Sequence, residues 1–104
     1  MLDFLKKLFG GASTDYKELV TGGAIIVDVR SAAEYKDGHI PGSKNYPLDT
    51  IRNKVPELKK LNKPVITVCR SGARSGVAKN ILHAAGIDVY NGGAWTSFQS
   101  KIAG

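Results

Sequence analysis

Cysteine, histidine and long apolar runs are all scarce in this sequence of 104 residues. A single cysteine cannot form an intramolecular disulfide, and a lone thiol is typical of a reducing compartment. One cysteine and two separated histidines lack the ligand clustering of a metal site. No stretch reaches the roughly 18–20 apolar residues of a membrane-spanning helix. We therefore expect a cytoplasmic protein with no membrane span, no metal and no other cofactor.

Negative charge is scarce as well, because 9 Asp and Glu residues stand against 15 Lys and Arg residues, which leaves a net charge of +6. A positive field attracts small anions, anionic partners or nucleic acid. The lysines are scattered, however, and no stretch interleaves basic and aromatic side chains as proteins that bind single strands do. The charge favours a small anionic substrate and argues against nucleic acid as a partner.

The N-terminal segment "MLDFLKKLFGG" (residues 1–11) places its apolar residues at nearly helical spacing. It lacks a leading basic region, and charged residues interrupt its apolar stretch, so it does not resemble a secretory signal. We interpret it as a short amphipathic helix that packs on the domain, with a membrane-surface or partner-docking segment as the alternative. Residues 12–104 are then a single domain, which we expect to be a monomer.

Strand-like and helix-like segments alternate along the rest of the chain. Apolar runs rich in β-branched residues predict buried strands, and shorter runs predict two further strands. Apolar residues at helical spacing predict helices between and after them. This alternation is typical of an α/β fold in which helices cover both faces of a mostly parallel sheet. The predicted strands are 24–29, 44–48, 64–69 and 87–90, and the longer predicted helices are 75–85 and 94–103.

Local signals refine these boundaries. Asp15 and Ser31 are placed to cap the first turns of short helices. The stretch 49–62 suggests helical turns that are interrupted near Pro56, and Gly92 and Gly93 suggest a turn before the last helix.

The only cysteine, Cys69, is the last residue of a predicted strand and opens the stretch "CRSGARS". In open parallel sheets, ligands bind beyond the carboxyl ends of the strands. The sequence "DVR" (28–30) closes the other long strand, so both stretches should meet at the same edge of the sheet. Residues 70–74 must turn from strand to helix there. Such a turn directs successive backbone N–H groups inwards and forms a cradle for negative charge.

Several features of this turn favour the thiolate of Cys69. Gly72 permits backbone angles that other residues resist, and the hydroxyls of Ser71 and Ser75 can donate hydrogen bonds. A helix N-terminus, inward amides and Arg74 together should place the thiol pKa roughly one to several units below about 8.5. We interpret Cys69 as a nucleophile beside an anion site. The alternative is a small buried cysteine without chemistry.

Neither histidine is a promising general base. His39 lies in a loop bounded by Gly and Pro, where we expect a structural hydrogen bond, and His83 lies within a helical pattern, where we expect a surface position. The chain also lacks the G-x-S-x-G elbow of a serine hydrolase.

Three segments of the chain resemble the rhodanese family. The stretch "DVRSAAEYKDGHIPGSKNYP" is similar to its signature of D-V-R, a spaced Glu, G-H-I-P-G-A and N-x-P. The stretch "VCRSGARS" resembles its active-site loop, and "YNGGAWTSF" its closing G-G-x-x-W-type segment. These segments follow the family's order and spacing, with Ser43 in place of the usual Ala and a GGAW spacing one residue tighter. The resemblance implies a rhodanese-like open sandwich with a central sheet of about five short strands.

The resemblance also implies a single-domain sulfurtransferase. In this family the cysteine attacks a sulfane-sulfur donor such as thiosulfate, becomes a persulfide, and passes the sulfur to a thiophilic acceptor such as cyanide or a thiol. Cys69 is the implied nucleophile and persulfide carrier. The implied substrate cradle consists of the backbone amides of Arg70, Ser71, Gly72, Ala73, Arg74 and Ser75.

Charged side chains near the loop have implied supporting roles. Arg74 would orient the oxygens of the donor or stabilise the loop, and Arg70 would point to the pocket mouth and select anionic donors. A structural set of ion pairs near the loop is implied for Asp28, Arg30 and Glu34.

Two other functions compete with sulfur transfer. Phosphatases and arsenate reductases of related fold place five residues between the cysteine and the arginine, whereas Cys69 and Arg74 enclose four, "RSGA". The smaller ring of amides suits a single sulfur atom better than phosphate. The second alternative is a rhodanese-fold sulfur carrier or interaction module that docks a protein partner, including a protein sulfur acceptor.

Overall fold

Two runs of β-branched residues form the centre of a parallel sheet in the computed structural model, which describes residues 14–103. The central strands β1 (Ile25–Asp28) and β3 (Val65–Cys69) pair with each other, and β2 (Lys44–Asn45) and β4 (Val89–Ala94) complete the order β2-β1-β3-β4. All neighbouring strands are parallel, so their carboxyl ends lie at one edge. The predicted α/β class is confirmed, with four strands in residues 14–103 where about five were expected.

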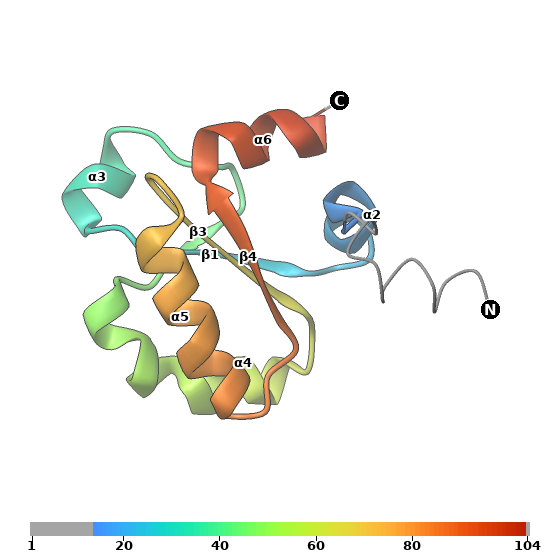
Figure 1. The fold of residues 1–104 in the computed structure, drawn as a ribbon, viewed down its shortest axis with the longest axis vertical. Coiled ribbons are helices and arrows are strands. Elements are labelled where there is room, and N and C mark those ends of the chain that lie inside the picture. The colour runs from blue at the N-terminus through green and yellow to red at the C-terminus, as the bar shows by residue number, and fades with distance from the viewer. Residues whose placement is uncertain (1–13, 104) are drawn as a thin grey trace.

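Helices cover both faces of this sheet (Figure 1). One face carries the 3-10 helix η1 (Leu48–Lys54), α4 (Val55–Leu61) and α5 (Ala73–Ala84). The other carries α2 (Tyr16–Thr21) and α6 (Trp95–Ala103). The short helix α3 (Ala32–Lys36) follows β1.

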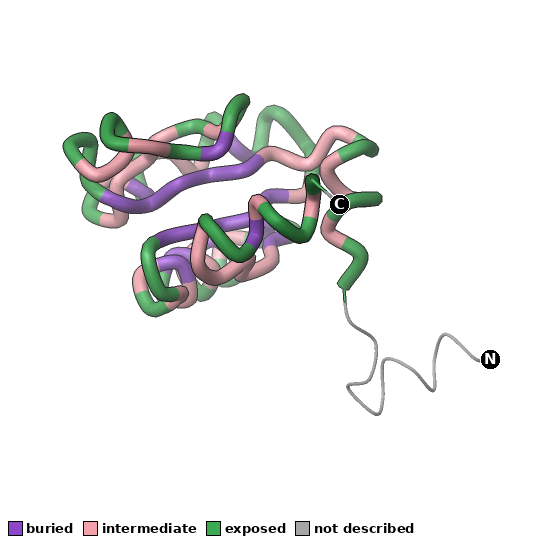
Figure 2. The backbone as a smooth tube through the Cα atoms, turned by 90° about the horizontal axis from the view of Figure 1, so that it is seen from above, coloured by how far each residue is buried: buried purple, intermediate pink, exposed green. Residues whose placement is uncertain are grey.

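The side chains of each central strand alternate between the two faces, as strand geometry requires. On one face Val27 and Val65 pack with Leu82 of α5. On the other, Ile66 packs with Phe98 of α6. Burial on both faces explains why these strands are continuous apolar runs. Figure 2 shows the buried residues concentrated along the strands, with exposed residues on the outer turns.

The helix caps follow the sequence closely. The Asp15 carboxylate accepts the Glu18 N–H at 3.0 Å and begins α2. Ser31 and Glu34 form a reciprocal capping box at the start of α3. The helical turns predicted for 49–62 are interrupted near Pro56, as expected, because η1 ends at Lys54 and α4 begins at Val55. Pro56 lies in the first turn of α4, where its missing N–H has no helical partner to lose.

Two boundary predictions are wrong. The predicted turn at Gly92 and Gly93 lies within β4, where the register against β3 shifts at Thr67/Val68. A Cβ on Gly92 would lie 2.9 Å from Ile66 Cγ2, so glycine lets the strand pass the core, and Gly93 takes a φ of +83° in the bulge. Helix α5 begins at Ala73, before the predicted start at Ser75, because Gly72 forms its N-cap.

The predicted amphipathic helix at 1–11 lies outside the described residues. Within residues 14–103, none of the helices combines the length and the apolar character needed to cross a membrane.

Candidate active site

Cys69 ends β3 beneath the short loop that leads into α5. Its side chain is buried, with 1% of its surface exposed. The Gly72 N–H donates to Cys69 Sγ at 3.0 Å and the Ser75 N–H at 3.4 Å, while Ser75 Oγ lies 3.3 Å from the sulfur. The sulfur therefore lies at the N-terminal end of α5, where free N–H groups and the helix dipole favour negative charge.

Gly72 gives the loop its shape. Its φ of +100° lies in the left-handed region that glycine adopts readily. A Cβ at this position would lie 3.4 Å from Gly93 Cα, which is ordinary contact, so conformation rather than space requires glycine. The turn at Gly72 brings two amides from α5 and its N-cap onto one sulfur.

The surroundings of Cys69 act on its thiol in opposite directions. Burial alone raises the pKa of Cys69, because it disfavours the charged form. Hydrogen bonds that a thiolate can accept from the Ser75 hydroxyl, once it turns towards the sulfur, and from the amides of Ser75, Gly72 and Ser71 outweigh burial, so the pKa is lowered overall. The loop thus favours a thiolate at a buried position.

Asn91 of β4 completes the site, and sequence analysis did not identify it. Its Oδ1 accepts the Ser75 hydroxyl at 2.7 Å and the Gly93 N–H at 3.0 Å. Its Nδ2 donates to the carbonyl oxygen of Gly72 at 3.2 Å. Asn91 stands one residue before the Gly-Gly pair in the segment "YNGGAWTSF", but its spacing from the cysteine carries no signal without knowledge that β4 lies beside β3.

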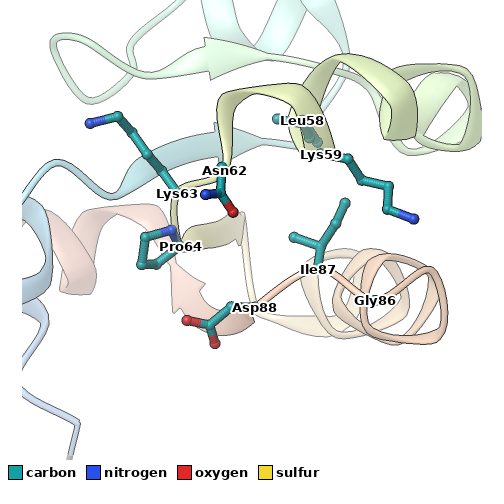
Figure 3. Close-up of a pocket in the computed structure, with 8 residues that line it drawn as sticks. All are labelled: Leu58, Lys59, Asn62, Lys63, Pro64, Gly86, Ile87 and Asp88. Atoms are coloured by element: carbon teal, nitrogen blue, oxygen red, sulfur yellow. The ribbon is translucent and has the colours of Figure 1, made fainter.

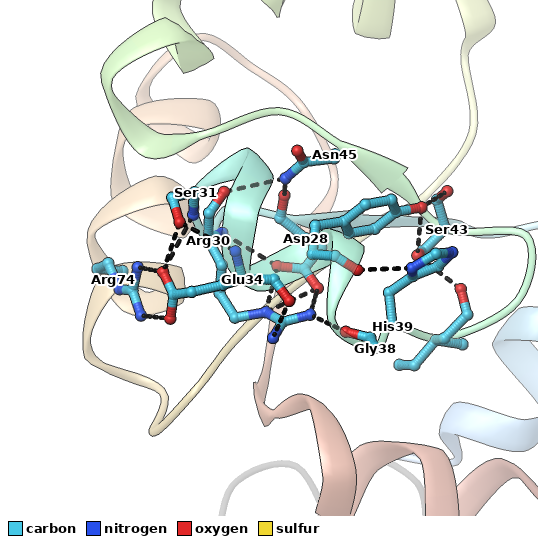
Figure 4. Close-up of polar contacts among 11 residues, drawn as sticks. Asp28, Arg30, Ser31, Glu34, Gly38, His39, Ser43, Asn45 and Arg74 are labelled. Carbon is cyan, nitrogen blue, oxygen red and sulfur yellow. Dashed lines mark hydrogen bonds and ion pairs between the residues drawn. The ribbon is translucent and has the colours of Figure 1, made fainter.

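Arg74 is held by Glu34 across the site. Its Nη1 and Nη2 bind the two Glu34 carboxylate oxygens at 2.8 and 3.0 Å (Figure 4). The same carboxylate accepts the Ser31 N–H and hydroxyl in the capping box. The hydrogen bond from Arg74, with those from Ser31, lowers the pKa of Glu34 to about 2. Arg74 thus ties the start of α5 to α3.

The other residues of the predicted substrate cradle are more exposed than Cys69. Arg70 and Ser71 are exposed, and Ala73 is the exposed first residue of α5. Gly72 and Ser75 donate backbone hydrogen bonds of 3.0 and 3.4 Å to Cys69 Sγ, and the Ser71 amide also favours its thiolate.

The sequence also matches a known protein family over most of its length. Residues 12–101 match the family described as "Rhodanese-like domain". The chain belongs to the rhodanese-like domain family.

Relatives of this rhodanese-like domain include proteins with named activities. It is 33% identical over 81 residues to the thiosulfate sulfurtransferase GlpE of Pseudoalteromonas translucida, and the match covers 76% of each chain. It is 36% identical over 61 residues to the putative sulfur carrier protein YrkF of Bacillus subtilis, a match covering 59% of this chain and 32% of YrkF. It is also 36% identical over 69 residues to the uncharacterized protein YqhL of Bacillus subtilis, with 65% of this chain and 54% of YqhL covered. The rhodanese-like domain thus spans about half of YqhL and about a third of YrkF.

A solved structure shares its fold. The structure described as "rhodanese with anions from E. coli" superposes with a TM-score of 0.65 at 30% identity, covering 71% of this chain and 89% of that one.

The predicted set of Asp28, Arg30 and Glu34 is divided between two ion pairs of the rhodanese-like domain, Asp28–Arg30 and Glu34–Arg74. Asp28 and Arg30 are buried and bind each other, with Arg30 Nη2 2.7 Å from Asp28 Oδ2. The Arg30 guanidinium also donates to the Gly38 carbonyl at 2.7 Å (Figure 4). It lies 4.7 Å from the centre of the Trp95 ring. Glu34 pairs with Arg74, and the carbonyl of Glu34 accepts Arg30 Nη1 at 3.3 Å.

Other polar features lie apart from Cys69 and its loop. His39 is exposed, with Nδ1 2.8 Å from the Tyr35 carbonyl and its ring stacked on that of Tyr35, and His83 is exposed near the end of α5. No group of three metal-ligating side chains occurs within residues 14–103. A hollow of about 290 Å³ opens at the other end of the sheet, beside Pro64 and Asp88, which precede β3 and β4 (Figure 3).

The Glu34–Arg74 pair gives a pH-dependent stability that Glu34→Gln removes. Folding lowers the pKa of Glu34 from 4.5 to about 2. The ionised carboxylate therefore makes its full contribution to the free energy of unfolding above pH 4.5, and this contribution is lost as the pH falls through about 2. We expect the stability difference between wild type and Glu34→Gln, measured by urea unfolding, to be constant near pH 7 and to shrink from pH 4.5 downwards. In an Arg74→Gln background the difference should be small throughout. A difference independent of pH would contradict this assignment.

Proposed function

We propose that this rhodanese-like domain is a sulfurtransferase that moves a sulfane sulfur from thiosulfate, or a similar anionic donor, to a thiol or cyanide through a persulfide on Cys69. The observation that carries the proposal is the pair of amides, from Gly72 and Ser75, aimed at the buried sulfur at the start of α5. Membership of the family and the relative named thiosulfate sulfurtransferase support it.

The proposed reaction has two half-reactions. The Cys69 thiolate attacks the outer sulfur of thiosulfate, the S–S bond of the donor breaks, and its electron pair leaves with sulfite. The product is a Cys69 persulfide whose outer sulfur carries the negative charge. An acceptor such as cyanide then bonds to that outer sulfur, and the electron pair of the breaking S–S bond returns to Cys69 Sγ. Donors fixed in advance stabilise the charge as it develops, and no separate base is required.

We assign the predicted substrate cradle as follows. The amides of residues 70–75 hold the negative sulfur, and the exposed Arg70 beside the loop attracts the anionic donor. The guanidinium of Arg74 braces the loop through Glu34 instead of reaching the donor. The net charge of +6 supports an anionic substrate, and the lone free thiol supports work in a reducing compartment such as the cytoplasm.

The direct test is persulfide formation on Cys69. The protein is incubated with thiosulfate, freed of excess donor and measured by intact mass beside Cys69→Ser. We expect wild type alone to gain one sulfur atom, about 32 Da, and to lose it when cyanide is added. A wild-type protein that gains no sulfur, although its thiol reacts with iodoacetamide, would contradict thiosulfate as the donor.

A sulfur carrier that delivers to a protein partner is the second candidate, supported by the relative named a putative sulfur carrier protein. It shares the Cys69 persulfide and differs in the acceptor. A persulfide that forms but discharges slowly to both cyanide and small thiols would favour this candidate. The phosphatase alternative has less support, because the ring between Cys69 and Arg74 is one residue shorter than in those enzymes.

A further inference from the structure

The Ser75 hydroxyl lies between two atoms that compete for its single hydrogen. Ser75 Oγ is 3.3 Å from Cys69 Sγ on one side and 2.7 Å from Asn91 Oδ1 on the other. A serine hydroxyl has one hydrogen to donate and two lone pairs to accept with. It can therefore donate to the sulfur or to Asn91, but not fully to both.

The amide of Asn91 has only one satisfactory orientation. In that orientation Oδ1 accepts the Gly93 N–H at 3.0 Å while Nδ2 donates to the Gly72 carbonyl at 3.2 Å. A flipped amide would bring two N–H groups together at Gly93 and two oxygens together at Gly72. The backbone of β4 and the loop thus fix an acceptor oxygen against Ser75. An O···O distance of 2.7 Å then requires the Ser75 hydrogen to lie on the Asn91 side.

This arrangement determines whether the Ser75 hydroxyl presents its hydrogen or a lone pair to Cys69 Sγ. With its hydrogen on Asn91, Ser75 Oγ turns a lone pair towards the sulfur, which suits an S–H donor or a sulfur without charge. A thiolate needs a donor there, so the hydroxyl must turn and leave the Asn91 oxygen with the Gly93 N–H alone. The amides of Gly72 and Ser75 support the thiolate in either case.

We propose that Asn91 is a positioning residue, which holds the Ser75 hydroxyl hydrogen away from Cys69 and so favours the uncharged states of this sulfur over its thiolate. The consequence for catalysis rests on the proposed function. In the persulfide, Cys69 Sγ is uncharged, and the negative charge lies on the outer sulfur. The Asn91–Ser75 hydrogen bond then stabilises the loaded state, because discharge must release Sγ as a thiolate leaving group.

The charged groups near the sulfur belong to other elements. Arg74 of α5 pairs with Glu34 of α3, Arg30 pairs with Asp28 at the end of β1, and Arg70 is exposed in the loop. Asn91 approaches from β4, which lies on the opposite side of β3 from β1. Substitutions at Asn91 therefore leave these charges in place.

The test measures the rate of Cys69 alkylation by iodoacetamide against pH in the full chain, without any sulfur donor. Asn91→Ala frees the Ser75 hydroxyl to donate to the thiolate, so the midpoint of the profile should move down by about one pH unit. The same substitution in a Ser75→Ala background should leave the midpoint where Ser75→Ala alone puts it. Asn80→Ala, at an exposed position on α5, is the matched control and should match wild type.

Two results would overturn the proposal. One is a midpoint that stays or rises in Asn91→Ala. The other is a shift of equal size with and without the Ser75 hydroxyl, since a merely structural role for Asn91 does not depend on that hydrogen. Asn91→Asp provides a second test should Asn91→Ala fail to fold. It keeps the acceptor and adds negative charge, so its midpoint should rise, and a fall would contradict the proposal.

Thiosulfate loading of the same variants separates this inference from the proposed function. Midpoints that shift as expected in a protein that forms no persulfide would reject sulfur transfer from thiosulfate and retain the Asn91 assignment for the free thiol. A persulfide that forms normally, with unshifted midpoints, would reject the Asn91 assignment alone. Where both hold, the persulfide of Asn91→Ala should discharge to cyanide faster than that of wild type.

Discussion

Replacing Gly72 with alanine is expected to lower kcat/KM for thiosulfate about a hundredfold, the effect of removing one fixed donor from a site of developing charge. The Gly72 N–H is the shortest hydrogen bond to Cys69 Sγ, at 3.0 Å, and it exists because Gly72 takes a φ of +100°. An alanine there costs about 1–2 kcal/mol in the left-handed conformation, so the loop relaxes and the amide turns away from the sulfur.

Gly86 provides the matched control for this substitution. It has a φ of +88°, and a Cβ on it would meet nothing within 4 Å. Gly86 follows α5 at the end remote from Cys69. Gly86→Ala therefore imposes similar backbone strain without contacting the loop between Cys69 and α5. We expect both variants to lose stability in thermal unfolding, but only Gly72→Ala to lose turnover. Equal turnover in the two variants would show that the Gly72 amide is not needed for the reaction.

The parts of the site that follow one another along the chain could be predicted from sequence. Cys69 and the amides on its sulfur lie within seven consecutive residues, so a strand-to-helix turn with a glycine was enough to predict an anion cradle. The capping role of Ser31 could be predicted for the same reason, because a capping box spans only four residues.

The parts that depend on tertiary pairing could not be predicted. Glu34 and Arg74 are 40 residues apart, and each was assigned a supporting role without its partner being recognised. Asn91 reaches Ser75 only because β4 lies beside β3 with a bulge at Thr67/Val68. The same bulge explains why Gly92, typical of a turn, lies in a strand, since its neighbours Ile66 and Phe98 leave no space for a side chain.

Removing the Asp28 carboxylate is expected to destabilise the fold by about 3–5 kcal/mol, because it leaves the Arg30 charge buried without a partner. Asp28 Oδ1 accepts the backbone N–H of Arg30 at 3.0 Å, and the carboxylate accepts Nε and Nη2 of its guanidinium. The free energy of unfolding of a domain of this kind is about 5–15 kcal/mol, so Asp28→Ala should be close to unfolded at 37 °C. Urea unfolding at pH 7 measures the loss, with the exposed Asp49→Ala as the control.

A double variant separates the unpaired charge from the lost contacts. Asp28→Leu combined with Arg30→Met removes both charges and fills the site with apolar atoms, which is often neutral or stabilising at a buried ion pair. We therefore expect the double variant to be more stable than Asp28→Ala, although it loses the bonds from Arg30 to the carbonyls of Gly38 and Glu34. If the double variant is no more stable, the role of the pair lies in those carbonyl bonds. Arg30 would then act chiefly by fixing the segment from α3 to Gly38 against the sheet, and the burial of its charge would matter little.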